Sequence, residues 1–231
     1  MDIVISGYGK MGKEIEAVVK SRGGKCLCRI TDGIALKSSR FEENVCIDFT
    51  TPGAFKENYK YLCDNFKAAV VGTTGWSDIK DDVLNYFKER NKTLIYATNF
   101  SIGVNIFFKL TELSSRLING LAHYDPYILE LHHKQKLDAP SGTAKTIERI
   151  IEDTFQKRVE AKSIRGGYIK GIHEVGFESE EDGITLKHEA YSRKGFAEGA
   201  VTAAEWAEDI KGIYEFKELL DEKFKNILKE Q

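Results

Sequence analysis

Residues 2–23, DIVISGYGKMGKEIEAVVKSRG, decide the fold of this 231-residue chain. The run DIVIS is short, apolar and rich in β-branched residues, and it ends at Gly7, which is typical of a buried strand. The next segment places Met11, Ile15 and Val19 on one helical face and ends in glycine, which predicts an amphipathic helix. A strand that runs directly into a helix indicates an α/β protein with a parallel sheet.

The turn between these two elements is GYGKMG, in which Gly7, Gly9 and Gly12 form the pattern G-x-G-x-x-G. The first glycine permits a tight turn, the second lets the backbone approach a pyrophosphate, and the third lets helix and strand pack closely. The helix start then offers N–H groups to the anion. The alternative is a tight turn with no ligand. We expect a dinucleotide site at Gly7, Tyr8, Gly9, Lys10, Met11 and Gly12.

An acidic residue at the end of the second strand would bind the ribose hydroxyls, and Asp32 lies at the expected spacing of about 20 residues after Gly12. Lys37 and Arg40 follow closely and could hold a 2′-phosphate instead. Asp32 could also be a turn residue before Gly33. The choice between NADH and NADPH therefore stays open.

Strands and helices alternate through the first hundred residues, which predicts a Rossmann-type parallel-sheet, dinucleotide-binding domain over residues 1–101. Residues 102–206 predict a second, α+β domain with a mixed, mostly antiparallel sheet. The segment from about 207 to 231 could return to the first domain.

Two further loops lie at the carboxyl ends of predicted strands, where cofactors bind in open α/β sheets. Alone, each would more often be a plain turn. Their small and polar residues could face a nicotinamide ring, and these candidates are Gly72, Thr73, Thr74, Ala97, Thr98, Asn99 and Phe100.

The segment ELHHKQKLDAPSGTA, residues 130–144, gathers protonatable groups ahead of a predicted helix. His132 or His133 could donate a proton near neutral pH, and their side chains should point to opposite faces of an extended segment. Ser141 is a good N-cap, so the N–H groups of Gly142 and Thr143 could hold an anion. Lys136 could face the same anion. Singly, each of these is more often a structural or surface residue.

Composition narrows the class of protein. The formal charge is −2, from 34 Lys and Arg against 36 Asp and Glu, so by charge we expect no nucleic-acid partner. We expect no membrane partner and a cytoplasmic location, because no stretch is apolar enough to span a bilayer and residues 1–12 do not read as a signal peptide. The four cysteines are expected to be reduced thiols, and no metal is expected.

The motif E-x-H-H-x-x-K-x-D-A-P-S-G-T-A resembles the signature segment of the dihydrodipicolinate (4-hydroxy-tetrahydrodipicolinate) reductase family. The motifs GYGKMG, DFTTP, VGTTGW, ATNFSIGVN, IRGGYIKGIHEV and HEAYSRKGFAEGAVTAAEW stand in the order that the family has, so the resemblance covers nearly the whole chain. It implies NAD(P)H-dependent reduction of a cyclic dicarboxylate in diaminopimelate and lysine biosynthesis, by a homotetramer assembled through the sheet of the second domain.

The resemblance also implies roles for single residues. His132 would be the catalytic proton donor, with Lys136 as a second donor. The substrate dicarboxylate would be bound by His133 and by the helix start at Ser141, Gly142 and Thr143. Arg165 and His173 would make rim or inter-subunit contacts, unless they are ordinary sheet residues. The chain departs from the family in its short glycine loop, between Asp32 and Asn44, and after Lys157.

Two other readings remain open. One is a different two-domain dehydrogenase, acting on an amino acid, which would keep GYGKMG without needing the whole 130–144 segment. The other is a non-catalytic NAD(P)-binding sensor, which would tolerate loss of His132 and Lys136, both of which are present.

Overall fold

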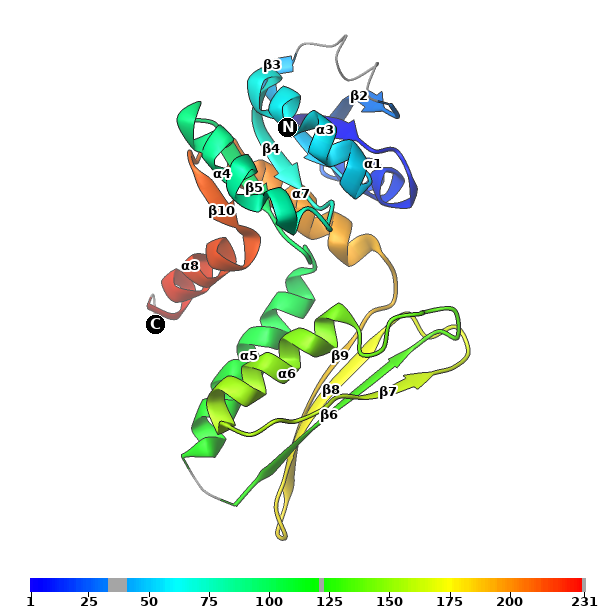
Figure 1. Ribbon diagram of the computed structural model, residues 1–231, viewed down its shortest axis with the longest axis vertical. Helices are drawn as coiled ribbons and strands as arrows, with labels where there is room; N and C mark the ends of the chain where they lie inside the picture. Colours follow the sequence, from blue (N-terminus) through cyan, green and yellow to red (C-terminus); the bar gives the residue numbers. More distant parts are fainter. Residues whose placement is uncertain (33–40, 121–122, 230–231) are drawn as a thin grey trace. The chain divides into compact units, whose positions relative to one another are not determined.

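The computed structural model describes residues 1–32, 41–120 and 123–229 (Figure 1). The chain forms two compact units. The first comprises Met1–Ser101 together with Arg193–Gln231, and the second comprises Ile102–Ser192. The chain thus leaves the first unit once and returns to it.

The first unit is built on a six-stranded sheet in the order β10-β5-β4-β3-β1-β2, with every pair parallel. Its strands are β1 (Asp2–Ser6), β2 (Lys25–Ile30), β3 (Phe41–Asp48), β4 (Phe66–Val71), β5 (Thr93–Tyr96) and β10 (Ile213–Glu215). Its helices are α1 (Lys10–Ser21), α3 (Pro52–Asn65), α4 (Lys80–Glu89), α7 (Lys194–Ala207) and α8 (Phe216–Lys229), with a 3₁₀ turn, η1 (Ser77–Ile79). This is the predicted Rossmann-type arrangement.

The sequence explains why this sheet is central. Ile3, Val4 and Ile5 are consecutive and all fully buried, because helices cover both faces of a parallel sheet. Since the strands are parallel, the loops after β1, β3 and β4 leave from the same edge. The glycine loop lies on that edge.

Helix α7 corrects the predicted boundary at residue 206. The chain re-enters the first unit at Arg193, so α7 belongs there and not to the second unit. The helix is rich in small residues, and Ala197, Ala200 and Val201 are fully buried. Close packing against the unit's strands decides its place, together with an ion pair of 2.8 Å between Arg22 of α1 and Glu205.

The second unit has a four-stranded sheet in the order β7-β6-β8-β9, with β6 and β7 parallel and the other pairs antiparallel. Its elements are α5 (Ile102–Asn119), β6 (Asp125–His132), α6 (Gly142–Phe155), β7 (Lys162–Arg165), β8 (Ile172–Glu178) and β9 (Gly183–Glu189). The predicted mixed sheet is confirmed.

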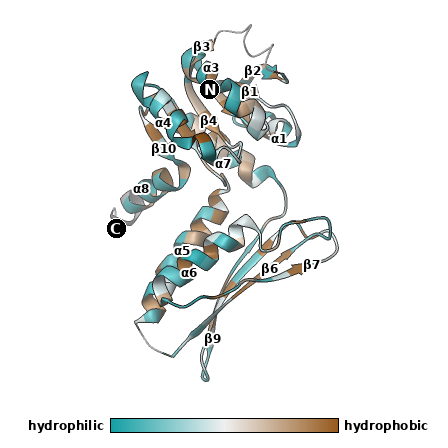
Figure 2. Cartoon of the chain, in the orientation of Figure 1, coloured by the Kyte–Doolittle hydropathy of each residue, from teal (hydrophilic) through white to brown (hydrophobic). Residues whose placement is uncertain are grey.

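Both helices of the second unit pack on one face of its sheet. Each carries polar and apolar residues side by side, as amphipathic helices do (Figure 2). The core contains Phe107 of α5, Ile147 of α6, Ile128 of β6 and Val175 of β8. Among the described helices of the chain, none is long and apolar enough to cross a membrane.

The packing of α7 yields a stability prediction. A Cβ at Gly199 would overlap the backbone carbonyl oxygen of Phe100, whereas a Cβ at Gly195 would meet nothing closer than the Ser101 hydroxyl at 3.7 Å. We expect Gly199→Ala to lower the free energy of unfolding by about 1–3 kcal/mol, as overpacking does. The matched change Gly195→Ala should be neutral or stabilising by up to about 1 kcal/mol. Denaturant unfolding of both variants checks this, and equal stabilities would contradict the packing described.

Candidate functional site

The glycine loop of the first unit forms an open backbone cradle. Gly7 has φ +90°, and a Cβ there would overlap the carbonyl of Phe49. A Cβ at Gly12 would overlap the carbonyl of Gly7, while a Cβ at Gly9 meets no protein atom within 4 Å. The loop is therefore closed on the protein side and open at Gly9. Since α1 begins at Lys10 without a side-chain cap, its first N–H groups suit a phosphate.

The side chain of Tyr8 contacts other residues of the first unit. Its hydroxyl donates to the carboxylate of Glu16, which is 4% exposed, and the guanidinium of Arg29 lies 5.6 Å from the centre of its ring. Hydrogen bonds from Arg29, Lys20 and Tyr8 hold the pKa of Glu16 well below its usual range. The side chain of Tyr8 thus anchors the loop to α1.

The loop after β4 is fastened by a buried carboxylate, that of Asp48. The hydroxyl of Thr73 donates to it over 2.6 Å, the hydroxyl of Ser6 over 2.7 Å and that of Thr50 over 3.0 Å. Burial raises the pKa of Asp48 in spite of these donors. The ends of β1, β3 and β4 are therefore tied together. Thr73 is used in this contact, whereas Thr74 is exposed.

The loop after β5 also contains both buried and exposed residues. Ala97 is 8% exposed, and the ring of Phe100 is buried against Phe216 with ring centres 4.9 Å apart, so its side chain belongs to the core. Thr98 is exposed, and Asn99 accepts a hydrogen bond from the Ser101 N–H.

The residue predicted to bind the ribose, Asp32, is exposed just beyond the end of β2. Lys37 and Arg40, the candidates for a 2′-phosphate, lie outside the described residues.

In the second unit, strand β6 delivers the candidate catalytic groups. Its buried residues alternate, so Ile128, Glu130 and His132 all face the helices. His132 is 7% exposed, whereas His133, the next residue, is half-buried beyond the strand end. The two histidines occupy different environments, as the sequence predicts.

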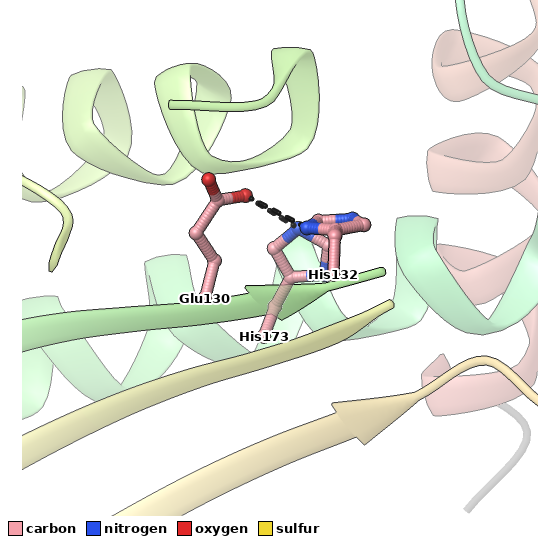
Figure 3. A group of neighbouring side chains, drawn as sticks. All are labelled: Glu130, His132 and His173. Atoms are coloured by element: carbon pink, nitrogen blue, oxygen red, sulfur yellow. Dashed lines mark ion pairs between the residues drawn. The ribbon is translucent and has the colours of Figure 1, made fainter. Parts of the chain in front are cut away.

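Glu130 is fully buried, and its side chain lies beside His132 and His173 (Figure 3). Its Oε1 accepts hydrogen bonds from the Ser163 hydroxyl at 2.6 Å, the Arg165 guanidinium at 2.8 Å and the Ser141 N–H at 3.1 Å. Burial alone would raise the pKa of this carboxyl, but these three donors outweigh it and hold the pKa at about 2. Glu130 is therefore a carboxylate at neutral pH.

The second oxygen of Glu130 faces two histidines. Its Oε2 lies 3.3 Å from Nδ1 of His132 and 3.6 Å from Nε2 of His173. The His132 ring is at ion-pair distance but is not turned to complete a hydrogen bond, so neither Oε2 nor Nδ1 has a hydrogen-bond partner among the described residues. Burial lowers the pKa of His132, and the carboxylate of Glu130 opposes this shift. Nε2 of His132 faces Gly171, where an added Cβ would come within 3.1 Å of it.

Ser141 connects this group to the start of α6. As predicted, it is the N-cap, and its hydroxyl accepts from the Ala144 N–H. The same hydroxyl lies 3.1 Å from Nε2 of His173, so both polar groups of Ser141 are engaged within the protein. Gly142 is exposed and Thr143 half-buried at the first turn of the helix, where N–H groups lack intrahelical partners.

Lys136 belongs to the loop that joins these parts. Its ammonium donates to Asp138 over 2.7 Å, and the backbone carbonyl of Asp138 accepts from Arg165 over 2.6 Å. The loop is thus held to the same guanidinium that pairs with Glu130. The arrangement offers a buried imidazole, a nearby ammonium and a helix start, which suits an anionic substrate that receives a proton.

Three of these groups could in principle hold a metal, since Glu130, His132 and His173 each offer a ligand atom within 4.8 Å of the others. The charge of Glu130 is already balanced by Arg165. A divalent cation there would bring uncompensated charge into a buried site, which is costly.

Comparison with known proteins identifies the family. The model described as "Dihydrodipicolinate reductase, N-terminus" matches residues 26–100, and that described as "Dihydrodipicolinate reductase, C-terminus" matches residues 103–220. A 4-hydroxy-tetrahydrodipicolinate reductase of Christiangramia forsetii is 38% identical, over 98% of this chain and 100% of that protein.

The chain belongs to the dihydrodipicolinate reductase family. Another 4-hydroxy-tetrahydrodipicolinate reductase, of Bdellovibrio bacteriovorus, is 33% identical over 94% of both chains. Among solved structures, the dipicolinate-bound dihydrodipicolinate reductase of Paenisporosarcina sp. TG-14 has the same fold, with a TM-score of 0.76 at 23% identity, covering 93% of this chain and 97% of that one.

Sequence reasoning missed part of the site. It gave no role to Glu130 or Ser163, because both act through partners far along the chain. The sequence left Arg165 and His173 open between rim or inter-subunit contacts and ordinary sheet positions; in the structure His173 is 5% exposed, and both side chains face the Glu130 carboxylate. The strand pairing Glu130–His173 and Glu130–Ser163 brings them there.

The burial of His173 predicts a pH effect on stability. Burial, with His132 nearby, lowers its pKa from 6.5 to about 4, so folding disfavours its protonation. This stabilisation is present above pH 6.5 and is lost as the pH falls toward 4. We expect His173→Gln to flatten the decline of unfolding free energy in this window, by up to about 1.4 kcal/mol per pH unit. Parallel decline of the two proteins in urea titrations would contradict it.

Proposed function

We propose that this chain catalyses the NAD(P)H-dependent reduction of 4-hydroxy-tetrahydrodipicolinate to tetrahydrodipicolinate, in diaminopimelate and lysine biosynthesis. The observation that carries the proposal is the buried His132 beside the Glu130 carboxylate, next to the uncovered start of α6. Similarity to named reductases over nearly the whole chain supports the same reaction.

The reaction balances with one hydride and one proton. The substrate loses its hydroxyl as water and gains a hydride, so one proton is consumed for each reduced cofactor oxidised. A nicotinamide dinucleotide is the cofactor, and when bound it supplies the hydride. The protein must therefore hold a dicarboxylate and deliver a proton.

The first unit would hold the cofactor. The open cradle at Gly9 and the start of α1 would bind its pyrophosphate, and the exposed Thr74 and Thr98 lie on loops that suit the nicotinamide side. Asp32 would accept hydrogen bonds from the ribose hydroxyls and repel a 2′-phosphate, which favours NADH.

The second unit would hold the substrate. His132 would donate the proton, and Lys136 would pair with a substrate carboxylate and serve as a second donor. His133 and the N–H groups of Gly142 and Thr143 would bind carboxylate oxygens. Ser141 would act on the substrate indirectly, by capping α6, because its own hydroxyl and N–H are engaged.

A homotetramer would assemble through the second unit's sheet. Within that unit, the face opposite α5 and α6 carries Ile164, which is 48% exposed, with the half-buried Leu131 and Ile172 beside it. Apolar side chains on an uncovered sheet face suit an interface between copies.

A coupled assay tests the proposed function. Pyruvate and aspartate semialdehyde are supplied with the upstream synthase, and absorbance loss of NADH and of NADPH is followed separately. We expect oxidation that depends on the synthase product, with NADH the faster cofactor. Failure to oxidise either cofactor, by a protein that still binds NADH, would exclude the reductase and favour a sensor or an amino-acid dehydrogenase.

Two lysines of the same loop make a matched pair for this assay. Lys136→Ala should lower kcat/KM by roughly 10²-fold or more, through loss of carboxylate binding and proton donation. Lys134→Ala should leave it unchanged, because Lys134 is exposed and has no role in the proposed site. Equal effects of the two substitutions would show that Lys136 has no specific role in the reaction.

A further inference from the structure

The carboxylate of Glu130 is fully buried beside His132, and this placement has a chemical consequence. Proton donation from a neutral imidazole N–H is very weak, so His132 must act as an imidazolium that releases its proton from one defined nitrogen. Nδ1 is turned toward Glu130, at 3.3 Å from Oε2, while Nε2 lies on the Gly171 side. The ring therefore has an inner and an outer nitrogen.

We propose that Glu130 is the positioning residue for His132: its Oε2 accepts the Nδ1–H of His132, leaves Nε2 as the nitrogen that transfers the proton, and stabilises the imidazolium. This inference rests on the proposed function. In the step itself, the Nε2–H bond breaks, the proton passes to the substrate, and the imidazolium becomes a neutral ring that keeps its proton on Nδ1.

The two carboxylate oxygens of Glu130 make different contacts. Oε1 receives all three of its donors, from Ser141, Ser163 and Arg165, and they fix the carboxylate in the buried strand. In the part of the chain that the structure describes, no group donates a hydrogen bond to Oε2, although it is buried. A buried carboxylate oxygen without a donor is costly, and a small rotation of the His132 ring would supply one.

His173 lies beside both Glu130 and His132. Its Nε2 lies between the Ser141 hydroxyl, at 3.1 Å, and Oε2 of Glu130, at 3.6 Å, and its ring packs edge-on against that of His132 (Figure 3). Burial lowers the pKa of His173 to about 4, so it stays neutral while His132 cycles. Glu130 thereby links the proton donor to the cap of the helix that would bind the substrate carboxylate.

Replacement of Glu130 by glutamine predicts a specific change. The three donors at Oε1 require an acceptor, so the amide oxygen of the variant would take that position and its NH₂ would face His132. A donor facing Nδ1 forces the ring into the tautomer with its proton on Nε2, as an asparagine does behind the histidine of serine proteases. The variant would also lack the negative charge that stabilises the imidazolium.

The direct measurement is the tautomer of His132. The chain has five histidines, so long-range ¹H–¹⁵N spectra of ¹⁵N-histidine-labelled protein can resolve them, with His132→Gln for assignment. We expect the Nδ1–H tautomer in the wild type above its pKa and the Nε2–H tautomer in Glu130→Gln. Glu148→Gln is the matched control, because the Glu148 carboxylate accepts from the backbone N–H of Ala161 and not from His132, and it should leave the spectrum of His132 unchanged.

The kinetic measurement follows kcat against pH. The groups that face His132 are Glu130 on its own strand, Lys136 and Asp138 in the next loop, Arg165 on β7 and His173 on β8. Since the acid form donates, kcat falls as pH rises through the pKa of His132, and loss of the Glu130 charge moves this limb to lower pH. We expect Glu130→Gln to reduce kcat by roughly 10²–10⁴-fold, with a smaller effect on KM.

The outcomes separate the inference from the proposed function. An Nε2–H tautomer in the wild type, or the same tautomer and pH limb in Glu130→Gln, would overturn the role of Glu130. The wild-type spectrum decides the tautomer even if Glu130→Gln does not fold. A protein that shows the expected tautomers but reduces no substrate would refute the proposed function and leave the Glu130–His132 arrangement standing.

Discussion

The second unit depends on the burial of one negative charge. A carboxylate without solvent exposure is strongly destabilising unless it is paired and hydrogen-bonded, and Glu130 is fully buried. Its donors come from β7, from the cap of α6 and from the end of β7 at Arg165, and two histidines lie against its other oxygen. Satisfying this charge therefore brings together the segments that carry the candidate catalytic groups. The same contacts that stabilise the fold prepare the site.

The first unit also contains a buried carboxylate, that of Asp48, but its hydrogen-bond partners are of a different kind. Asp48 is paired with hydroxyl groups, so burial still raises its pKa, whereas the guanidinium of Arg165 helps to hold the pKa of Glu130 at about 2. Asp48 joins the ends of three parallel strands, where the loops proposed to bind the cofactor begin. Asp48 and Glu130 each fix loops on which the proposed ligand of their unit would lie. The difference in charge balance suits one to a structural tie and the other to proton chemistry.

Short-range sequence patterns predict much of the fold and part of the candidate site. The strand, glycine turn and helix of residues 2–23, the boundary after Ser101 and the cap at Ser141 all follow from short-range rules. The side-chain alternation of β6 also separates His132 from His133, as expected. These features depend on neighbours within a few residues, which a sequence displays directly.

What the sequence could not reveal depends on distant partners. Ser163 and Arg165 are 33 and 35 residues from Glu130, and strand register alone brings them to it. The hydroxyls of Tyr8 and Thr73 lie in loops proposed to bind the cofactor, yet they bind Glu16 and Asp48 inside the protein. Helix α7 joins the first unit because its small residues fit that sheet, which no local propensity encodes.

We expect a dicarboxylate to bind next to a neutral His132, which Glu130 prepares to accept a positive charge. Calorimetry of dipicolinate binding at pH 7.5, in buffers of different ionisation enthalpy, measures the protons taken up on binding. We expect an uptake approaching one proton in the wild type and a value near zero in His132→Gln, because a bound dianion raises the pKa of the buried imidazole. Binding without proton uptake in the wild type, or equal uptake in both proteins, would contradict it.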